Sequence, residues 1–340
     1  MRRILINSTI DEIAERYAGN LFLNGKPACK PKRKLELILE RIEKDKCRKW
    51  KKYFAYVKAL YDKYEKILVL HPRNFKRYKT LYFSNLSEKE LNSTTWRKWG
   101  KKQKKITFCN TIIAAMRYED IRSQEIVKYI DKELRIKTCV YCNANYIASV
   151  NVPGEGLKAR YEIDHFLPKY MYPFLCTSFF NFQPSCSFCN RWKLKDESLF
   201  NLYTDKQSEV NPFVFSLDQD SILLYKTDRN AENLCIDIES KEIKKIGGKV
   251  VKLIDNHNTV FHISALYEAF KEEAEEILIR YLNNTQTYLN QMQNNIIQNS
   301  NYNVSTAFRL TNGFLYEEEN VHLKPLSKMK RDIAKQLGLI

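Results

Sequence analysis

Four cysteines in two closely spaced pairs are the residues of this sequence best suited to chemistry. Cys139 and Cys142 form one pair, and Cys186 and Cys189 form the other. Two such pairs supply four thiolates, the usual ligands of a tetrahedral structural zinc ion with Zn–S distances of about 2.3 Å. The alternative is four unrelated buried thiols. Because both pairs are intact, we expect one zinc ion that joins the two ends of residues 139–189.

The other five of the nine cysteines have no such spacing, and we expect them to serve in packing. An odd number of cysteines on a chain whose first residues turn polar before any signal-peptide core can form argues against a disulfide framework. We therefore expect a cytoplasmic protein. The five packing cysteines are Cys29, Cys47, Cys109, Cys176 and Cys235.

Several polar residues that suit phosphodiester hydrolysis lie between and beside the pairs. A neutral imidazole, as His165 would offer near neutral pH, can accept a proton from water. Asp164 and Asn190 carry the hard oxygen ligands that Mg²⁺ or Mn²⁺ accepts. Adjacent side chains of a strand point to opposite faces, so we expect the strand to end or bend at Asp164 and His165, with Pro168 helping to break it. A lone histidine is more often structural, and the catalytic interpretation of His165 depends on these neighbours.

Three runs in this segment together resemble a known family. They are I-D-H-F-L-P-K from Ile163, N-F-Q-P-S-C from Asn181 and C-x-x-C-N-x-x-K from Cys186. Their order, spacing and residue types resemble the signature of the HNH nucleases, the ββα-metal fold, in a subgroup with a structural zinc. The resemblance covers residues 138–195.

The resemblance implies an endonuclease with two kinds of metal ion, a structural Zn²⁺ and a catalytic Mg²⁺ or Mn²⁺. It implies that Asp164 and Asn190 hold the catalytic ion, that His165 is the general base, and that Asn181 holds the loop that carries the base. Asn190 stands where many members have histidine, and the glycine pair that many members carry after the base is missing. For Asn181 a purely structural turn role is nearly as well supported.

The excess positive charge of the chain lies in its first third. Residues 1–110 hold 29 Lys and Arg against 11 Asp and Glu, whereas the other 230 residues hold 28 against 29. A polyanion partner explains this distribution, because neutralised phosphates release counterions, and a solvated basic surface is the alternative. We expect nucleic-acid contacts, with DNA favoured over RNA. The candidate residues are Arg48, Lys49, Lys51 and Lys52 in this region and Lys169, Arg191 and Lys193 near the cysteines.

The spacing of apolar residues predicts a mainly helical α+β protein in three regions. Residues 1–110 are expected to form a basic helical region, 111–210 the zinc-stapled nuclease module, and 211–340 a mixed β then helical region that could bind a partner. Helical periodicity runs from Lys34 to Leu70 and again from Ile263 to Leu282. Short strands are expected at Phe213–Phe215, Ile222–Tyr225, Leu234–Ile238 and Ile243–Ile246, a helix tail with a flexible connector at Asn283–Asn303, and a last helix at Ser327–Leu337.

These observations favour a metal-dependent HNH endonuclease, with a role in bacterial antiviral defence or restriction. Two other functions stay open. One is a zinc-dependent nucleic-acid-binding module in which Asp164, His165 and Asn190 do no chemistry. The other is the nuclease subunit of an effector complex that contains an ATPase. Apolar runs far shorter than about 20 residues exclude a transmembrane helix.

Overall fold

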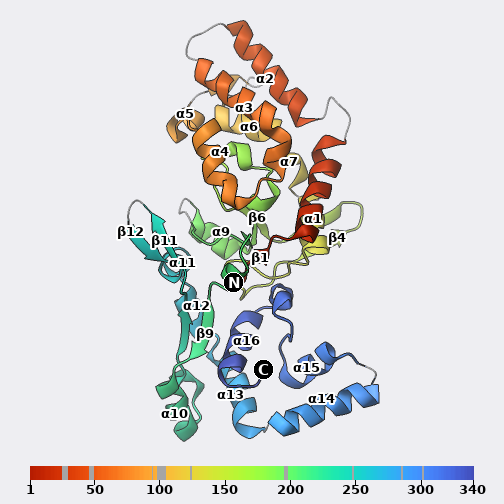
Figure 1. Cartoon of the computed structure of the whole chain (residues 1–340), viewed down its shortest axis with the longest axis vertical. Helices are drawn as coiled ribbons and strands as arrows, with labels where there is room; N and C mark the ends of the chain where they lie inside the picture. The colour runs from red at the N-terminus through yellow and green to blue at the C-terminus, as the bar shows by residue number, and fades with distance from the viewer. Residues whose placement is uncertain are drawn as a thin grey trace.

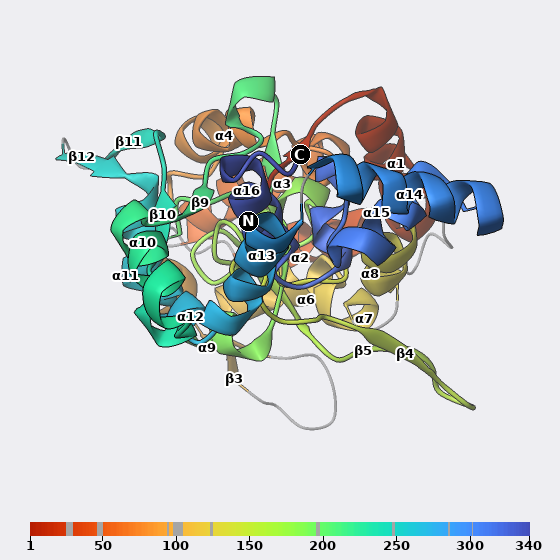
Figure 2. The same ribbon diagram turned by 90° about the horizontal axis from the view of Figure 1, so that it is seen from below.

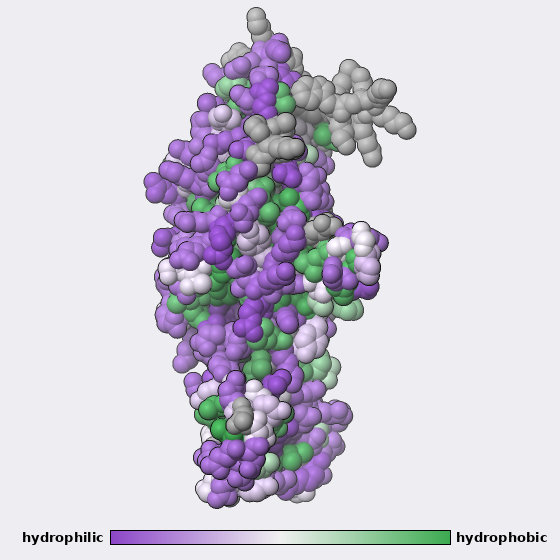
Figure 3. All heavy atoms as spheres, turned by 90° about the vertical axis from the view of Figure 1, so that its right-hand side faces the viewer, coloured by the Kyte–Doolittle hydropathy of each residue, from purple (hydrophilic) through white to green (hydrophobic). Residues whose placement is uncertain are grey.

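The protein is an elongated, mostly helical α+β molecule in which a small central unit separates two helical ends (Figure 1). The computed structural model describes residues 1–24, 30–45, 50–93, 95–97, 105–122, 125–194, 198–246, 249–284, 286–300 and 302–340. Its sheets, within these ranges, are two-stranded. None of the helices in these ranges is long and apolar enough to cross a bilayer. On the face shown in Figure 3, hydrophilic side chains predominate and apolar ones are scattered.

Helices of the first third form one end of the molecule. The predicted helical stretch from Lys34 to Leu70 is two helices, α2 (Pro31–Asp45) and α3 (Lys51–Leu68), which pack side by side. The buried side chains of α3 include Tyr53, Tyr56 and Tyr64, so these aromatics belong to the core. The other elements are α1 (Ser8–Ala18), α4 (Phe75–Tyr82), α5 (Glu88–Ser93), β2 (Thr95–Arg97), β3 (Lys105–Thr107) and α6 (Phe108–Ala115).

The central unit is built around one antiparallel hairpin. Strand β6 (Glu162–His165) pairs with β7 (Phe182–Ser185), and helix α9 (Ser187–Lys193) follows directly. The start of the chain also reaches this unit, because β1 (Ile4–Leu5) lies parallel to β8 (Tyr203–Thr204). The remaining central elements are α7 (Tyr118–Ile121), α8 (Glu125–Lys128), β4 (Ser149–Val152) and β5 (Gly156–Ala159).

The last third begins with short strands and ends in helices, as the sequence predicts, but two of the expected elements are wrong. The expected strand Ile222–Tyr225 lies inside helix α10 (Gln219–Asp228). The expected connector Asn283–Asn303 is mostly helix α14 (Gln286–Ser300). The other elements are β9 (Val214–Leu217), β10 (Ile236–Glu239), β11 (Ile243–Ile246), β12 (Lys249–Lys252), α11 (Leu253–Phe261), α12 (Ile263–Glu268), α13 (Lys271–Asn283), α15 (Val304–Asn312) and α16 (Ser327–Gln336).

The C-terminal helices are anchored to the turn that carries the first cysteine pair. His257 of α11 hydrogen-bonds through Nε2 to the carbonyl oxygen of Tyr141 at 2.7 Å. Tyr267 of α12 donates its hydroxyl to the carbonyl oxygen of Cys142 at 2.7 Å. At the start of α16, the amide of Lys328 donates to Oδ1 of Asn143 at 3.1 Å. The conformation of residues 141–143 therefore positions three helices of the last third.

Candidate functional site

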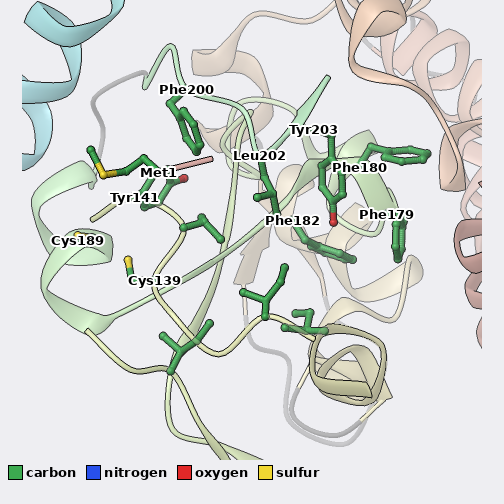
Figure 4. Close-up of a cluster of buried hydrophobic side chains, with 14 of the residues drawn as sticks. Met1, Cys139, Tyr141, Phe179, Phe180, Phe182, Cys189, Phe200, Leu202 and Tyr203 are labelled. Carbon is green, nitrogen blue, oxygen red and sulfur yellow. The ribbon is translucent and has the colours of Figure 1, made fainter. Parts of the chain in front are cut away.

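The two cysteine pairs meet as one buried cluster that fits a zinc ion. The four Sγ atoms of Cys139, Cys142, Cys186 and Cys189 lie within 4.8 Å of one another. Tetrahedral coordination at about 2.3 Å would place the sulfur atoms roughly 3.8 Å apart. Figure 4 shows Cys139 and Cys189 facing each other beside Met1 and Tyr141. The cluster is therefore a candidate structural zinc site.

Nearby N–H groups point at sulfur atoms of the cysteine cluster and favour their anionic form. The backbone amide of Ala144 lies 3.4 Å from Sγ of Cys142, and the side-chain amide of Asn145 lies 3.7 Å from the sulfurs of both Cys142 and Cys186. N–H groups directed at sulfur stabilise thiolates, the form that binds metal. Within the described chain, no other group of three His, Cys, Asp or Glu side chains is close enough to hold an ion.

The remaining cysteines that the structure describes are free thiols. Cys109 and Cys176 are buried, as a packing role requires. Cys235 is exposed, so the packing prediction is wrong for this residue. Cys29 and Cys47 lie outside the described residues.

The cysteine cluster joins the hairpin to helix α9. Cys186 directly follows β7 and precedes the first residue of α9, while Cys189 lies in the first turn of the helix. Across the hairpin, Asp164 faces Gln183 and His165 faces Phe182. Strand β6 ends at His165, but Asp164 and His165 both pair regularly with β7, so the bend that would turn them to one face is absent. Their side chains project from opposite faces, and the structure does not bring them together on one side of the hairpin.

Asp164 is held by two polar groups on its face of the hairpin. The hydroxyl of Tyr141 donates to Oδ2 at 2.6 Å, and Nζ of Lys193 contacts the same oxygen at 2.7 Å. Lys193 also donates to the carbonyl oxygen of His165. The Lys193 side chain is only 2% exposed. In this conformation it cannot make the phosphate contact that the sequence suggests, because its ammonium group is buried and bonded to Asp164 and to the His165 carbonyl oxygen.

His165 is buried on the other face, and burial sets its protonation state. Its ring is 5.0 Å from the ring of Tyr118 and 5.7 Å from that of Phe182. Desolvation, followed by the positive charge of Lys169, lowers the pKa of His165 from 6.5 to about 4. Nε2 lies 3.0 Å from the carbonyl oxygen of Cys176, so Nε2 carries the proton and the lone pair is on Nδ1. The imidazole is neutral at neutral pH.

Asn181 closes the loop that connects the two strands of the hairpin. Its Oδ1 accepts the amide of Leu167 at 2.8 Å, and its Nδ2 donates to the carbonyl oxygens of Leu167 and Leu175, both at 3.1 Å. The residue is fully buried. All three bonds fix the segment that follows His165, so Asn181 sets the path of the chain directly after the candidate base.

The other predicted residues near the cysteines differ in how accessible they are. Asn190 is half-buried on α9, three residues before Lys193. Arg191 is exposed, and its guanidinium group lies 5.1 Å from the ring centre of Phe188. Lys169 is half-buried, with Nζ 4.3 Å from the ring centre of Tyr118 and 3.8 Å from a carboxylate oxygen of Glu119.

The basic cluster of the N-terminal third is described in part. Lys51 and Lys52 are exposed at the start of α3, and Lys52 contacts Glu90 at 3.1 Å. Arg48 and Lys49 lie outside the described residues. Accessible lysines of α3 are compatible with the predicted polyanion contact, which stays a prediction.

The sequence interpretation missed Tyr141 and gave the other partner of Asp164, Lys193, a phosphate contact in place of this ion pair. Tyr141 lies between the paired cysteines Cys139 and Cys142, so the zinc spacing that identifies the pair also fixes this hydroxyl near the hairpin. Lys193 is recognisable only by its position three residues after Asn190, on the same side of α9.

Comparisons with protein-family models, curated proteins and solved structures find no match for this chain.

Proposed function

We propose that this protein is a metal-dependent nuclease of the HNH type that hydrolyses phosphodiester bonds, with DNA as the favoured substrate. The observation that carries the proposal is the arrangement of the central unit. One buried four-cysteine cluster fixes the strand of Asp164 and His165 against the helix of Asn190. The sequence resemblance assigns these three residues to hydrolysis.

His165 would act as the general base. A neutral imidazole with its proton on Nε2, held by the Cys176 carbonyl group, has its lone pair on Nδ1. Because the ring is 3% exposed and projects from the face opposite Asp164, it would accept a water proton near the cation only after the segment that follows β6 moves. The low pKa of His165 keeps the ring unprotonated down to about pH 4. Asn181 would keep the residues after the base in place through its three hydrogen bonds.

Asp164 and Asn190 would hold a divalent cation. Both Tyr141 and Lys193 bond Oδ2 of Asp164, whereas no hydrogen bond from the described residues reaches Oδ1. That oxygen and the half-buried amide of Asn190 are hard donors of the kind that Mg²⁺ and Mn²⁺ prefer. When bound, the cation would neutralise charge on the scissile phosphate. Lys193 would keep Asp164 in one orientation.

A zinc-dependent nucleic-acid-binding module without catalysis is the second candidate function. It is favoured by the burial of His165, which is only 3% exposed, and by the contact of Lys193 with Asp164. In such a module the hairpin polar groups would stabilise the fold, and the molecule would bind nucleic acid without cutting it. The proposed role in antiviral defence depends on the nuclease activity.

A nicking assay on supercoiled plasmid with added Mg²⁺ or Mn²⁺ separates the two functions. For a nuclease, His165→Ala should lower the cleavage rate by about 100-fold or more. Glu162→Gln, an exposed carboxylate of the same strand, is the matched control and should cut at the rate of the unaltered protein. Zinc content and thermal midpoint are measured for both variants. Binding without cleavage by the unaltered protein, or full cleavage by folded His165→Ala, would reject the nuclease.

A further inference from the structure

A pocket of about 640 Å³ lies beside the candidate catalytic hairpin. Phe166, the residue after His165, forms part of its wall. Other wall residues are Leu199, Asn201 and Tyr203, from the segment that runs over the hairpin. Its volume is within the range of small-ligand sites. The pocket therefore offers an apolar wall with an aromatic ring next to the proposed site of hydrolysis.

Asn201 provides a buried hydrogen-bond donor in this wall that lacks a partner. The residue is 7% exposed. Its Oδ1 accepts from Nε2 of Gln183 and from the amide of Tyr203, both at 3.1 Å, which fixes the orientation of the side-chain amide. Nδ2 has no hydrogen-bond partner in the described structure. A buried unpaired donor is costly, and an acceptor on a ligand would satisfy it.

Gln183 connects this donor to the candidate site. It is the residue directly opposite Asp164 in the hairpin, and it also accepts the amide of Leu202 at 3.1 Å. The segment with Asn201 is therefore fixed on the Asp164 side of the hairpin. Phe166, two residues after Asp164, also lines the pocket. A ligand bound there would therefore lie next to the strand that carries Asp164.

Three exposed or half-exposed cationic side chains line the pocket. Those of Arg73 and Lys206 are 64% and 71% exposed, and that of Lys244 is 37% exposed. Each is paired with a carboxylate: Arg73 with Asp205 at 3.4 Å, Lys206 with Glu209 at 2.8 Å and Lys244 with Glu242 at 2.6 Å. The pocket wall therefore suits an apolar, acceptor-bearing group, and the positive charge for an anion has to come from lysines outside these pairs.

Lys244 belongs both to the pocket and to a basic arm that continues from it. Figures 1 and 2 show the β11–β12 hairpin standing out from the body of the molecule. Residues 241–252 contain five lysines and one glutamate. Lys241, Lys249 and Lys252 are exposed, and no ion pair links them to a carboxylate in the described part of the chain. The arm therefore provides exposed lysines, without ion pairs among the described residues, on the hairpin that carries Lys244 of the pocket wall.

We propose that the pocket holds one unpaired nucleotide of a nucleic-acid substrate while the β11–β12 arm binds phosphates of the neighbouring nucleotides. A base provides the flat ring to lie on Phe166 and the acceptors for Nδ2 of Asn201, and its backbone provides the negative charge. A base within a duplex cannot enter such a pocket, so the substrate is single-stranded at this position. The inference rests on the proposed nuclease function and specifies its substrate class.

Binding without cleavage tests the arm. Fluorescence anisotropy of a labelled 20-nucleotide single-stranded DNA, without added divalent cations, gives the affinity over a range of salt concentrations. Neutralising two arm lysines, Lys249→Gln with Lys252→Gln, should weaken binding about tenfold or more and reduce the salt slope by about 1.4. The control is Lys226→Gln with Lys335→Gln, two exposed lysines elsewhere, which should leave both unchanged. An arm variant that matches the control would overturn the proposal.

A second comparison tests the pocket. The unaltered protein should bind the single strand about tenfold more tightly than the matching duplex, and Phe166→Ala, checked by its thermal midpoint, should remove most of this preference. Equal affinity for both forms, or an unchanged preference in folded Phe166→Ala, would overturn the pocket assignment. Single-stranded RNA of the same sequence shows which sugar is preferred. Binding with these properties but no cleavage would reject the nuclease alone, whereas cleavage with normal binding by the arm and Phe166 variants would reject the inference alone.

Discussion

At the scale of single residues, the buried ammonium group of Lys193 forms an ion pair with Asp164 at 2.7 Å. Removing one member of a buried ion pair leaves the other charge without compensation. Lys193→Met should therefore lower the free energy of unfolding, by about 3 kcal/mol, because the Lys193 side chain is 2% exposed and that of Asp164 is 18% exposed. Urea denaturation measures the change. Arg191→Met, on the exposed side of the same helix, is the control and should cost less than about 1 kcal/mol.

A stability of Lys193→Met equal to that of Arg191→Met would contradict the structural role of this lysine.

The same residue shows how much of the site could be predicted from the sequence. The cysteine cluster was predictable, because metal ligands require a fixed spacing that is visible in the chain. The burial of Lys193 was not, because a lysine beside Arg191 looks like any surface cation until the hairpin is folded over α9.

At the scale of elements, the spacing of apolar residues predicted some helices and missed others. It predicted the helical stretch from Lys34 to Leu70, which is formed by α2 and α3. The last helix, α16, also lies where the sequence predicts it. In α10, however, the apolar run that favoured a strand contains Leu223 and Leu224, which are 60% and 49% exposed. Side chains that do not contribute to the core mislead a prediction based on apolar residues.

Loss of zinc from the cysteine cluster should loosen helices that lie outside the hairpin. Cys186→Ser removes a ligand, so we expect the zinc content to fall from one ion per chain to near zero, because a structural zinc contributes on the order of 10 kcal/mol in small zinc folds. Since α11, α12 and α16 bond to residues 141–143, their amides should lose protection from hydrogen exchange. Zinc analysis and exchange mass spectrometry measure both effects. Cys235→Ser, at an exposed thiol, is the control.

Retention of one zinc ion by Cys186→Ser would disprove the ligand assignment. Loss of zinc with unchanged protection of the three helices would instead show that the turn at residues 141–143 keeps its shape without the ion. The effect of zinc loss on α11, α12 and α16 could not be predicted from the sequence. The contacts that transmit it join residues more than 110 positions apart, such as His257 and Tyr141.

At the scale of the whole molecule, buried histidines couple its stability to pH. Burial lowers the pKa of His257 and His322 to about 3 and that of His165 to about 4. Each sits in a different element: α11, the turn Glu318–Leu323 and β6. For His257 the cause is also visible in its contacts, because Nδ1 is buried without a partner in the described residues and has no acceptor for a second proton.

The sign of the effect follows from which state takes up protons first. An unfolded histidine binds its proton near pH 6.5, whereas these folded ones stay neutral down to about pH 3 or 4. Their contribution to stability is present above pH 6.5 and is lost as the pH falls toward the folded pKa values. At pH 5 the free energy of unfolding should be lower than at pH 7 by about 2 kcal/mol for each histidine.

Urea denaturation at pH 7, 6 and 5 measures this loss, and His257→Gln isolates one contribution. Glutamine keeps a side-chain N–H group for the Tyr141 carbonyl oxygen but cannot take up a proton, so the loss between pH 7 and 5 should shrink by about 2 kcal/mol. A variant with the same pH dependence as the unaltered protein would show that His257 is accessible to protons in the folded state. Because His257 links α11 to the turn between the first two cysteines, acid should loosen the C-terminal helices and the zinc turn together.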